Sequence, residues 1–478
     1  MEPMGRRAWI VMAAVSAALA AGCGGPSRPL FTGAAGFPAP VPLPVDLAGA
    51  GDPYFPTYGN GGYDVSAYDL KIKYDPASDQ LTGVATVTAT AKADLAKFHL
   101  DLHGLTVDKV TVDGAAATST RDGDELIITP GAPLANGKEF VAVVAYGGVP
   151  KAIKAPDLGV TGFLTTHDGA FTLGEPESAT TWFPVNDHPK DKALYTIELT
   201  VPTQLEAISN GLLDGRTAQG AWTSWKWRVT SPMAPYLATF VIGDYRLVEG
   251  THKGKPVLTA VAETLPKGEI DKAMASTTEI VDFLEQYFGP YPFDAYGGIV
   301  IDDERVRYAL ETQTRPVYSD AFWSRGANTI VVAHELAHQW FGDSVSVQAW
   351  QHIWLNEGFA TYAQWLWGEK LGVSTVQEEF DSRYDDPGSR IWDIAPGAPG
   401  ADNIFSGSVY ERGGMTLHAL RKQVGDEKFF EILKTWASEQ RDGNVTTTEF
   451  IALAERVSGQ QLDTLFQKWL FEVGRPAQ

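Results

Sequence analysis

Two histidines and a glutamate form the most distinctive chemical group of this 478-residue chain. They occur as His334-Glu335-x-x-His338, where the apolar spacing predicts a helix over residues 327–341. Residues four apart share one helix face, so both imidazoles can reach one metal ion at about 2.0–2.1 Å. Glu335 points about 100° away around the helix, where it can take a proton from a water at the metal. The alternative is a buried helix whose histidines are satisfied by hydrogen bonds in the core.

A third candidate ligand follows on the next predicted helix. Glu357 comes 19 positions after His338 in the string Trp-Leu-Asn-Glu-Gly-Phe-Ala, and that helix is predicted over residues 356–371. The spacing leaves room for a loop and an antiparallel helix that returns Glu357 to the metal. Two histidines, one carboxylate and an open fourth position are typical of catalytic zinc. We therefore expect one Zn²⁺ ion on His334, His338 and Glu357; a first-turn acid without a ligand role is the alternative.

The elements that must position these residues fall into two stretches of different pattern. Residues 63–244 show short apolar–polar alternations separated by Gly, Asp-Gly and Asn-Gly, which indicate an antiparallel β-rich domain. Helix-like spacing dominates residues 245–478, in the segments 269–287, 327–341, 356–371, 410–424, 426–439 and 447–457. We predict an α+β multidomain fold in which a β-rich N-terminal domain precedes a mainly α catalytic domain.

Composition limits the classes of function. The chain has 38 Lys and Arg against 59 Asp and Glu, a formal charge of −21, so we expect no nucleic-acid partner. Hydrophobic residues make up 44% and charged residues 20%, the balance of a folded protein. Cys23 is the one cysteine, which excludes an intrachain disulfide and a thiolate cluster. A metal ion must therefore be bound by His, Asp or Glu.

The start of the chain has the features of a secretory signal. Arg6 and Arg7 precede an apolar run over residues 8–21, shorter than the roughly 20 residues that span a bilayer. The run ends in Leu-Ala-Ala-Gly-Cys23, which resembles a bacterial lipobox with Ala20 where Leu is commonest. We expect residues 1–22 to be a signal peptide and Cys23 to be lipidated, anchoring the protein on the outward face of the cell membrane. Cleavage after Ala20 and secretion is the alternative.

The stretch that follows is rich in glycine and proline. Residues 23–62 lack a periodic apolar pattern, and this composition predicts a flexible tether between the anchor and the folded domains. A loop packed onto the folded part is the alternative around Tyr54-Phe55-Pro56.

The metal motif and its surroundings resemble a known family. His-Glu-Leu-Ala-His-Gln-Trp-Phe-Gly-Asp and Trp-Leu-Asn-Glu-Gly-Phe-Ala are similar to the strings of the M1 zinc metallopeptidases, the aminopeptidase N family. Further similar segments are Tyr287–Phe293, Pro232–Leu237, Gly474–Pro476 and Trp182–Pro189, the last with Val185 where Cys is usual. The resemblance implies a saddle-shaped β domain and a thermolysin-like (gluzincin) catalytic domain, without the C-terminal helical domains of longer relatives.

The resemblance also implies residues that bind the substrate. Glu311 matches the acid of the family's Gly-Ala-Met-Glu-Asn exopeptidase motif, where a carboxylate would bind the cationic amino terminus of a peptide. Tyr308, Leu310 and Thr312 depart from that motif, and a bulky Tyr308 would narrow the cleft or alter which end of the substrate fits. Glu175 matches an N-terminal-domain residue that the family directs at the same amine, and Glu177 is a neighbouring candidate. The alternatives are a strand-edge acid for Glu311 and loop charges for the others.

Tyr410 precedes Glu-Arg-Gly-Gly as the family's catalytic tyrosine precedes its own segment. Its hydroxyl would donate to the oxyanion formed at the scissile carbonyl; a buried aromatic at a helix start is the alternative. The resemblance therefore implies a zinc aminopeptidase that hydrolyses peptides with a free N-terminus, with Glu335 as general base; we expect it to be a monomer. The alternatives are an endopeptidase or non-peptide hydrolase of the same fold, and a catalytically inert peptide-binding lipoprotein.

Overall fold

The computed structural model describes residues 48–155 and 158–477. The chain divides into two units, Met1–Asp46 and Leu47–Gln478, and the description concerns the second. The predicted signal peptide, Cys23 and the tether up to residue 47 lie outside the described residues. In the described part, no helix has the length and apolar character that a membrane crossing requires.

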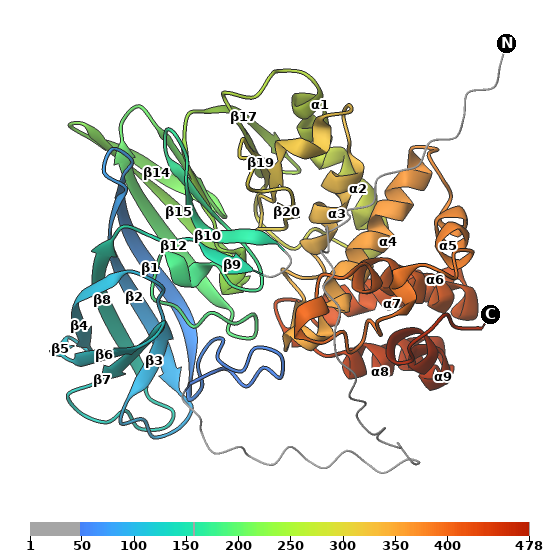
Figure 1. The fold of residues 1–478 in the computed structure, drawn as a ribbon, viewed down its shortest axis with the longest axis horizontal. Coiled ribbons are helices and arrows are strands. Elements are labelled where there is room, and N and C mark those ends of the chain that lie inside the picture. The colour runs from blue at the N-terminus through green and yellow to red at the C-terminus, as the bar shows by residue number, and fades with distance from the viewer. Residues whose placement is uncertain (1–47, 156–157, 478) are drawn as a thin grey trace, which may run out of the picture. The chain divides into compact units, whose positions relative to one another are not determined.

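An eight-stranded sheet forms the first layer of the N-terminal domain (Figure 1). Its central strand β1 (Tyr63–Asp75) pairs antiparallel with β2 (Gln80–Ala91) and parallel with β12 (Ala193–Pro202). The remaining strands are β4 (Thr106–Val112), β5 (Ala115–Ala116), β8 (Glu139–Gly148), β14 (Leu212–Gln219) and β15 (Trp222–Met233). Buried and exposed residues alternate along β1 and β2, because one face of the sheet meets the core.

Two smaller sheets complete this domain. One contains β9 (Ile153–Ala155), β10 (Gly159–Thr165), β11 (Ala170–Leu173), β13 (Glu206–Ser209) and β16 (Phe240–Gly243). The other contains β3 (Phe98–Asp101), β6 (Thr118–Asp122) and β7 (Glu125–Thr129). Aromatic rings join these layers: Phe183 packs edge-on to Tyr68 of β1 at 5.4 Å, and Trp182 packs on Phe240 of β16 at 5.1 Å. The predicted β-rich domain is confirmed.

The catalytic half begins with a mixed sheet that the sequence pattern did not indicate. Its strands are β17 (Tyr245–His252), β18 (Lys255–Ala262), β19 (Tyr296–Ile301), β20 (Ala309–Leu310) and β21 (Val317–Ser319). Strand β19 is buried on both faces and pairs in parallel with β18 and β21, so it shows no alternation of polar and apolar residues. The prediction of a helix over 269–287 is also corrected, because Ser276 separates α1 (Glu269–Ala275) from α2 (Thr277–Phe288).

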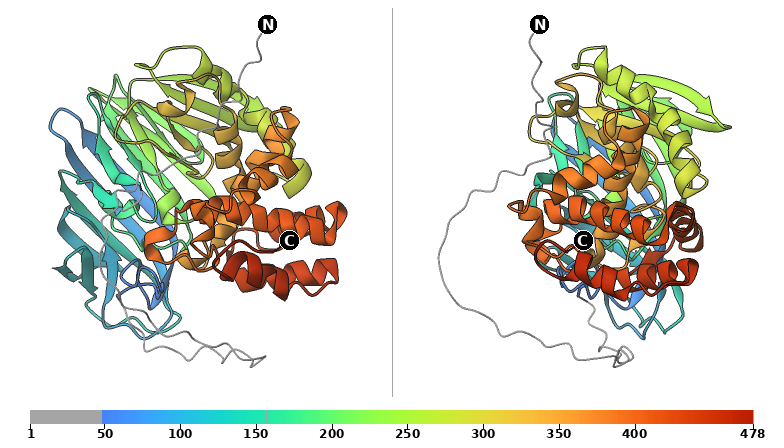
Figure 2. Two further views of the ribbon diagram at one scale, coloured as in Figure 1. Left: turned by 45° about the vertical axis from the view of Figure 1, so that its right-hand side comes forward. Right: turned by 90° about the vertical axis from the view of Figure 1, so that its right-hand side faces the viewer.

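Helices make up most of the rest of this half (Figure 2), together with a two-stranded sheet of β22 (Ser346–Val347) and β23 (Asn444–Val445). The helices are α3 (Ile330–His338), α4 (Trp354–Lys370), α5 (Val376–Tyr384), α6 (Gly413–Val424), α7 (Asp426–Glu439), α8 (Thr447–Ser458) and α9 (Asp463–Phe466). Helix α8 begins with a capping box in which Thr446 and Glu449 exchange side-chain and backbone hydrogen bonds. The buried guanidinium of Arg412 donates to the carbonyls of Lys468 and Trp469, which fixes the C-terminal segment beside α6. The two-part architecture therefore agrees with the prediction.

The end of the predicted tether is a packed loop. Ala48 and Asn60 form an antiparallel bridge, and the residues between them, here called the bridging loop (residues 48–60), rest on both domains. Tyr54 and Phe55 pack against the core, and Asp52 is buried. The prediction of a tether is therefore wrong for this part, and the packed alternative holds. Glycine and proline made the loop resemble a linker, whereas hydrogen bonds within it and to residues as distant as Trp350 and Gly400 hold it in place.

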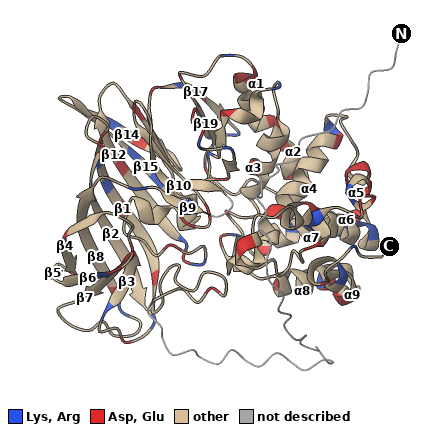
Figure 3. Cartoon of the chain, in the orientation of Figure 1, with Lys and Arg blue, Asp and Glu red and all other residues tan. Residues whose placement is uncertain are grey.

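Charged residues are distributed over both halves of the described chain. Acidic and basic positions lie on the strands of the N-terminal domain and on the helices alike (Figure 3). Most are exposed, whereas several acids close to α3 and α4 are buried.

Candidate active site

Helices α3 and α4 bring the three predicted metal ligands together. The Nε2 atoms of His334 and His338 lie 3.3 Å and 3.5 Å from the same carboxylate oxygen, Oε2 of Glu357. The two histidines come from one face of α3, and Glu357 comes from the first turn of α4. All three side chains are buried, and their potential ligand atoms lie within 4.8 Å of one another. This is the arrangement expected for a mononuclear metal site.

Hydrogen bonds behind the histidines orient their rings. Nδ1 of His334 lies 3.0 Å from Oε1 of Gln364, and Nδ1 of His338 lies 3.0 Å from the carbonyl oxygen of Phe341. Because a carbonyl oxygen can only accept, each Nδ1 carries the proton and each Nε2 presents a lone pair. Both lone pairs then face the oxygen of Glu357, and a metal cation between the three groups would make this arrangement favourable. The donor set therefore fits a divalent metal with nitrogen and oxygen ligands.

Two glycines allow a third helix to approach the metal group. A Cβ atom added to Gly358 would lie 2.9 Å from the carbonyl carbon of Gly413, and one added to Gly413 would lie 2.9 Å from Cα of Gly358. Helices α4 and α6 therefore meet backbone to backbone, one residue beyond Glu357. Tyr410 lies in the π-helical turn Ser408–Arg412 that leads into α6, and its ring stacks with that of His334 at 6.0 Å. Single π-helical turns are common at functional sites because they redirect a side chain.

Further acids face the same space. Glu311 and Glu335 each offer an oxygen within 4.8 Å of a ring nitrogen of His338, and both carboxylates are buried. Glu175, at the end of β11, is also buried, and its Oε1 has no hydrogen-bond partner. Burial raises the pKa of Glu175 well above its ordinary value, and the charges of Glu311 and Glu357 raise it further. The carboxyl groups of Glu175, Glu311, Glu335 and Glu357 are all buried. To be ionised together, they require compensating positive charge.

Glu311 is the most firmly held of these acids. Its Oε1 accepts a hydrogen bond of 3.0 Å from the hydroxyl of Tyr236, and its carbonyl accepts one of 2.9 Å from Nε2 of Gln339. Gln339 directly follows the second histidine of α3, so the metal helix also fixes the backbone of Glu311. A carboxylate so oriented can bind a substrate cation with little loss of side-chain freedom.

The structure thus brings together the predicted residues His334, Glu335, His338, Glu357, Glu311, Glu175 and Tyr410. It does not bring Glu177 there: that side chain is hydrogen-bonded to Tyr58 of the bridging loop and lies next to Asp187. Cys23 lies outside the described residues.

Sequence reasoning assigned no role to several supporting residues. Gln364 lies seven positions after Glu357, on the same face of α4 two turns later, so helical periodicity could have identified it. Tyr236 and Gln339 lie inside segments used for the family resemblance, but the hydrogen bonds to Glu311 depend on tertiary structure alone.

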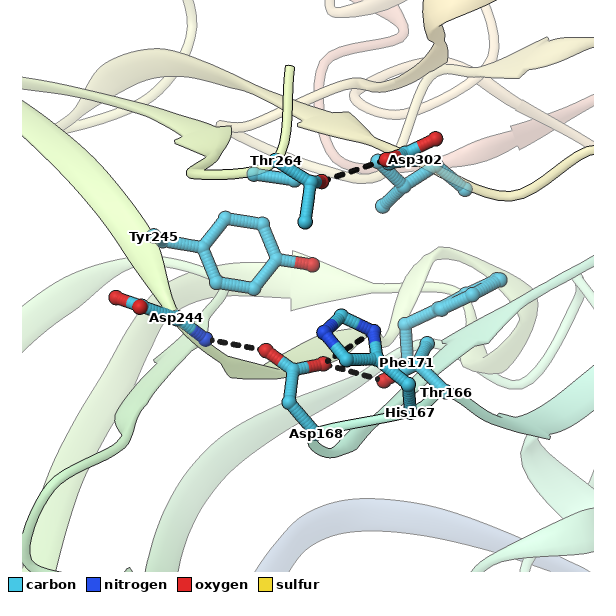
Figure 4. Close-up of a pocket in the computed structure, with 10 residues that line it drawn as sticks. Thr166, His167, Asp168, Phe171, Asp244, Tyr245, Thr264 and Asp302 are labelled. Atoms are coloured by element: carbon cyan, nitrogen blue, oxygen red, sulfur yellow. Dashed lines mark hydrogen bonds and ion pairs between the residues drawn. The ribbon is translucent and has the colours of Figure 1, made fainter.

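A small pocket elsewhere shares none of these residues (Figure 4). It is lined by the turn between β10 and β11, which carries Asp168, by single residues of β17, β18 and β19, and by Asp244 and Asp302, which lie just outside β17 and β19. Asp168 already accepts hydrogen bonds from the Thr166 hydroxyl and the Asp244 backbone, and Asp302 accepts one from Thr264. Asp168 and Asp302 thus already have hydrogen-bond partners within the protein, and the metal group remains the candidate active site.

Each half of the chain matches a known sequence family. The peptidase family M1 domain matches residues 272–469, and the peptidase M1 N-terminal domain matches residues 65–237. Aminopeptidase M1 of Arabidopsis thaliana is 28% identical over 448 residues, covering 86% of this chain and 50% of that protein. Glutamyl aminopeptidase of Rattus norvegicus is 28% identical over 339 residues, covering 65% of this chain and 36% of that protein. The chain spans about half the length, or less, of these curated relatives.

Solved structures match over a larger share of their length. An M1 zinc metallopeptidase from Deinococcus radiodurans has a TM-score of 0.79 at 28% identity, covering 90% of this chain and 99% of that one. A mutant of the Deinococcus radiodurans enzyme bound to a Tyr-Ser-Ala substrate has a TM-score of 0.81 at 28% identity, covering 90% of this chain and 98% of that one. Fold and site together define the class of two-domain metallopeptidases. The chain belongs to peptidase family M1.

Proposed function

We propose that this protein is a zinc-dependent aminopeptidase that removes residues from the N-terminus of peptides. The observation that carries the proposal is the pair of buried acids beside the metal group. His334, His338 and Glu357 suffice to bind zinc, so Glu311 and Glu175 are additional buried carboxyl groups in the same enclosed space, and a nearby cation would favour their ionised form. A peptide's amino terminus is largely protonated near neutral pH and supplies the cation that these acids require.

His334, His338 and Glu357 would hold the zinc ion, through Nε2 of each ring and a carboxylate oxygen. When bound, zinc supplies Lewis acidity, which polarises the scissile carbonyl and makes water nucleophilic near neutral pH. Gln364 and the carbonyl of Phe341 hold the two imidazoles in the required tautomer.

The remaining residues bind, orient and move protons. Glu311 and Glu175 bind the substrate ammonium, so that the first peptide bond lies at the metal group. Glu335 accepts a proton from the attacking water and delivers it to the leaving amine. The hydroxyl of Tyr410 donates to the developing oxyanion. Glu335→Gln should retain zinc in metal analysis and lose nearly all turnover; substantial activity would refute its assignment as the base.

A matched pair of substrates tests the proposal. An aminoacyl-arylamide with a free amine should be hydrolysed, and its N-acetylated form should be hydrolysed at least about a hundredfold more slowly, since the ammonium contact is lost. A zinc chelator should abolish both rates, and added zinc should restore them. Equal rates for free and blocked substrates would contradict the proposal and favour an endopeptidase.

An endopeptidase is the second candidate because of Tyr308. In the family's exopeptidase motif this position is glycine, whereas here a tyrosine ring is buried, three residues before Glu311. Its hydroxyl is buried without a hydrogen-bond partner, and burial together with the charge of Glu175 raises the pKa of Tyr308 above its usual range. A bulky group here could change which part of the substrate fits. Cleavage of an N-acetylated peptide by the wild type would support this candidate.

For the location of the protein, we propose that a lipid at Cys23 anchors it on the outward face of the cell membrane. We also propose that the enzyme is a monomer. The proposal rests on the basic and apolar residues before Cys23 and on its place after Leu-Ala-Ala-Gly. Cys23→Ser should move the protein from the membrane fraction to the soluble fraction. Unchanged membrane association of this variant would contradict the anchor.

A further inference from the structure

The bridging loop lies outside both matched family segments, which begin at residues 65 and 272. It nevertheless contacts both domains. Nδ2 of Asn60 donates a 3.0 Å hydrogen bond to Asp101 of the N-terminal domain, and the hydroxyl of Tyr54 accepts one of 3.0 Å from the backbone of Gly400. The loop therefore joins parts of the chain that are far apart in sequence.

The strongest of these contacts is made by Asp52, whose side chain is fully buried. One oxygen, Oδ1, accepts from the backbone N–H groups of Tyr54 and Phe55 at 2.7 Å and 3.0 Å. The other, Oδ2, lies 3.1 Å from Nε2 of His188 and accepts from the backbone N–H of Trp350 at 2.8 Å. Four donors from three separate segments thus converge on one carboxylate, which makes Asp52 the junction between the loop and both domains.

The protonation of this junction follows from its neighbours. The backbone N–H of Lys190 donates to Nδ1 of His188 at 3.2 Å, so Nε2 carries the proton and donates to Asp52. Burial acts to raise the pKa of Asp52, but these hydrogen bonds outweigh it and hold the pKa below its ordinary value. The close fit is visible at Gly59, where a Cβ atom would lie 2.6 Å from Cβ of His188. Asp52 is therefore an ionised and fully satisfied group in a tightly packed setting.

A short series of contacts leads from this junction to the active site. Trp350 lies at the start of a 3₁₀ turn, Trp350–His352, immediately before α4. Its buried ring packs edge-to-face on Tyr236, with centroids 5.4 Å apart. The hydroxyl of Tyr236 in turn donates to Oε1 of Glu311 at 3.0 Å. The path runs from Asp52 through Trp350 and Tyr236 to the acid assigned to the substrate amine.

We propose that Asp52 is a positioning residue for substrate-amine recognition: by holding the backbone of Trp350, it fixes the ring against which Tyr236 packs and so orients Glu311. This inference rests on the proposed function for the role of Glu311. Loss of the Asp52 carboxylate leaves the buried N–H of Trp350 without an acceptor, which favours movement of this segment. The two histidine ligands have their own supports at Gln364 and Phe341, which do not involve Asp52, so we expect zinc to be retained.

The test compares Asp52→Ala with Asn60→Ala, a control that loosens the other end of the loop where it contacts the N-terminal domain alone. On a free-amine arylamide, Asp52→Ala should raise KM about tenfold with kcat changed less than about threefold, since a displaced binding group weakens substrate positioning. Asn60→Ala should change both constants less than about twofold. Zinc content should equal that of the wild type in both variants.

Two further measurements separate positioning from a general loss of stability. A hydroxamate inhibitor that lacks an amine should bind Asp52→Ala as tightly as the wild type, whereas an amino-hydroxamate should bind more weakly. Hydrogen exchange in the wild type should show a protected amide at Trp350, and Asp52→Ala should lose that protection. Equal weakening of both inhibitors, or unchanged exchange at Trp350, would overturn the inference.

A second variant keeps the test decisive if Asp52→Ala does not fold. Trp350→Phe leaves the backbone bond to Asp52 in place and weakens the contact between the ring and Tyr236, so it should raise KM for free-amine substrates in the same way. Unaltered KM in this variant would refute the path through Trp350. The exchange experiment needs no turnover, so a protein that lacks aminopeptidase activity would contradict the proposed function while the link from Asp52 to Trp350 remains measurable.

Discussion

The substitution Glu311→Gln tests most directly whether Glu311 binds the substrate amine. The change removes one charge and keeps the shape of the side chain, and the amide oxygen can still accept from Tyr236. Removing one partner of a buried, hydrogen-bonded charge pair costs about 2–5 kcal/mol. Because Glu175 remains as a second carboxylate, we expect a loss near the lower half of that range, about 3 kcal/mol. That corresponds to about a 150-fold lower kcat/KM, with most of the change in KM.

The assay is hydrolysis of a free-amine arylamide by Glu311→Gln and by a matched control. Glu177→Gln makes the same chemical change at a partly buried acid that faces Tyr58 and Asp187 and does not contact the metal group. The control should keep kcat/KM within about threefold of the wild type, the size of a minor surface effect. If Glu311→Gln also stays within that range, Glu311 does not bind the substrate amine and the assignment is wrong.

Three other predictions concern the supports of the site and the stability of the fold. Gln364→Ala should weaken zinc binding about 10–100-fold in a chelator competition, because His334 loses the acceptor that orients its ring. Gly413→Ala should destabilise the protein by about 1–3 kcal/mol in urea unfolding, since the new Cβ would meet the backbone of Gly358, whereas Gly215→Ala, which has nothing within 4 Å, should not. Burial, together with the nearby positive charges of Arg421 and Lys422, lowers the pKa of His418 to about 4. As the pH falls from about 6.5 to 4, His418 is therefore protonated in the unfolded chain but not in the folded protein, and the folded protein loses stability. The wild type should therefore lose about 1 kcal/mol more stability than His418→Gln between pH 7 and pH 5, after allowance for solvent screening, and identical pH profiles would contradict this.

The metal group was readable from sequence because its geometry is local. His334 and His338 are four residues apart, so helical periodicity places them on one face of α3, and the 18 residues between His338 and Glu357 leave room for a loop and a returning helix. The β-rich and helical halves were also predictable, since amphipathic strands and helices leave periodic patterns. Strand β19 left none, because a parallel strand buried on both faces reads as a plain apolar run.

The supports of the site could not be predicted because they depend on contacts between distant segments. Asp52 and Trp350 are 298 positions apart, and the hydroxyl of Tyr236 reaches an acid 75 positions away. A glycine- and proline-rich composition indicated a tether over residues 23–62, and nothing local showed that its last part carries a fully satisfied buried carboxylate. Gly413 could not be predicted for the same reason. A side chain is excluded at this position because the backbone of α4 lies against it.

The order in which a peptide is shortened tests the central claim most directly. An unblocked decapeptide is incubated with the zinc-loaded protein and sampled over time by mass spectrometry. We predict successive loss of single residues from the N-terminus, with no cleavage of the acetylated peptide and none after zinc is chelated. Internal fragments as the first products, or equal cleavage of the acetylated peptide, would contradict the assignment of Glu311 and Glu175 to the substrate amine and with it the proposed aminopeptidase function.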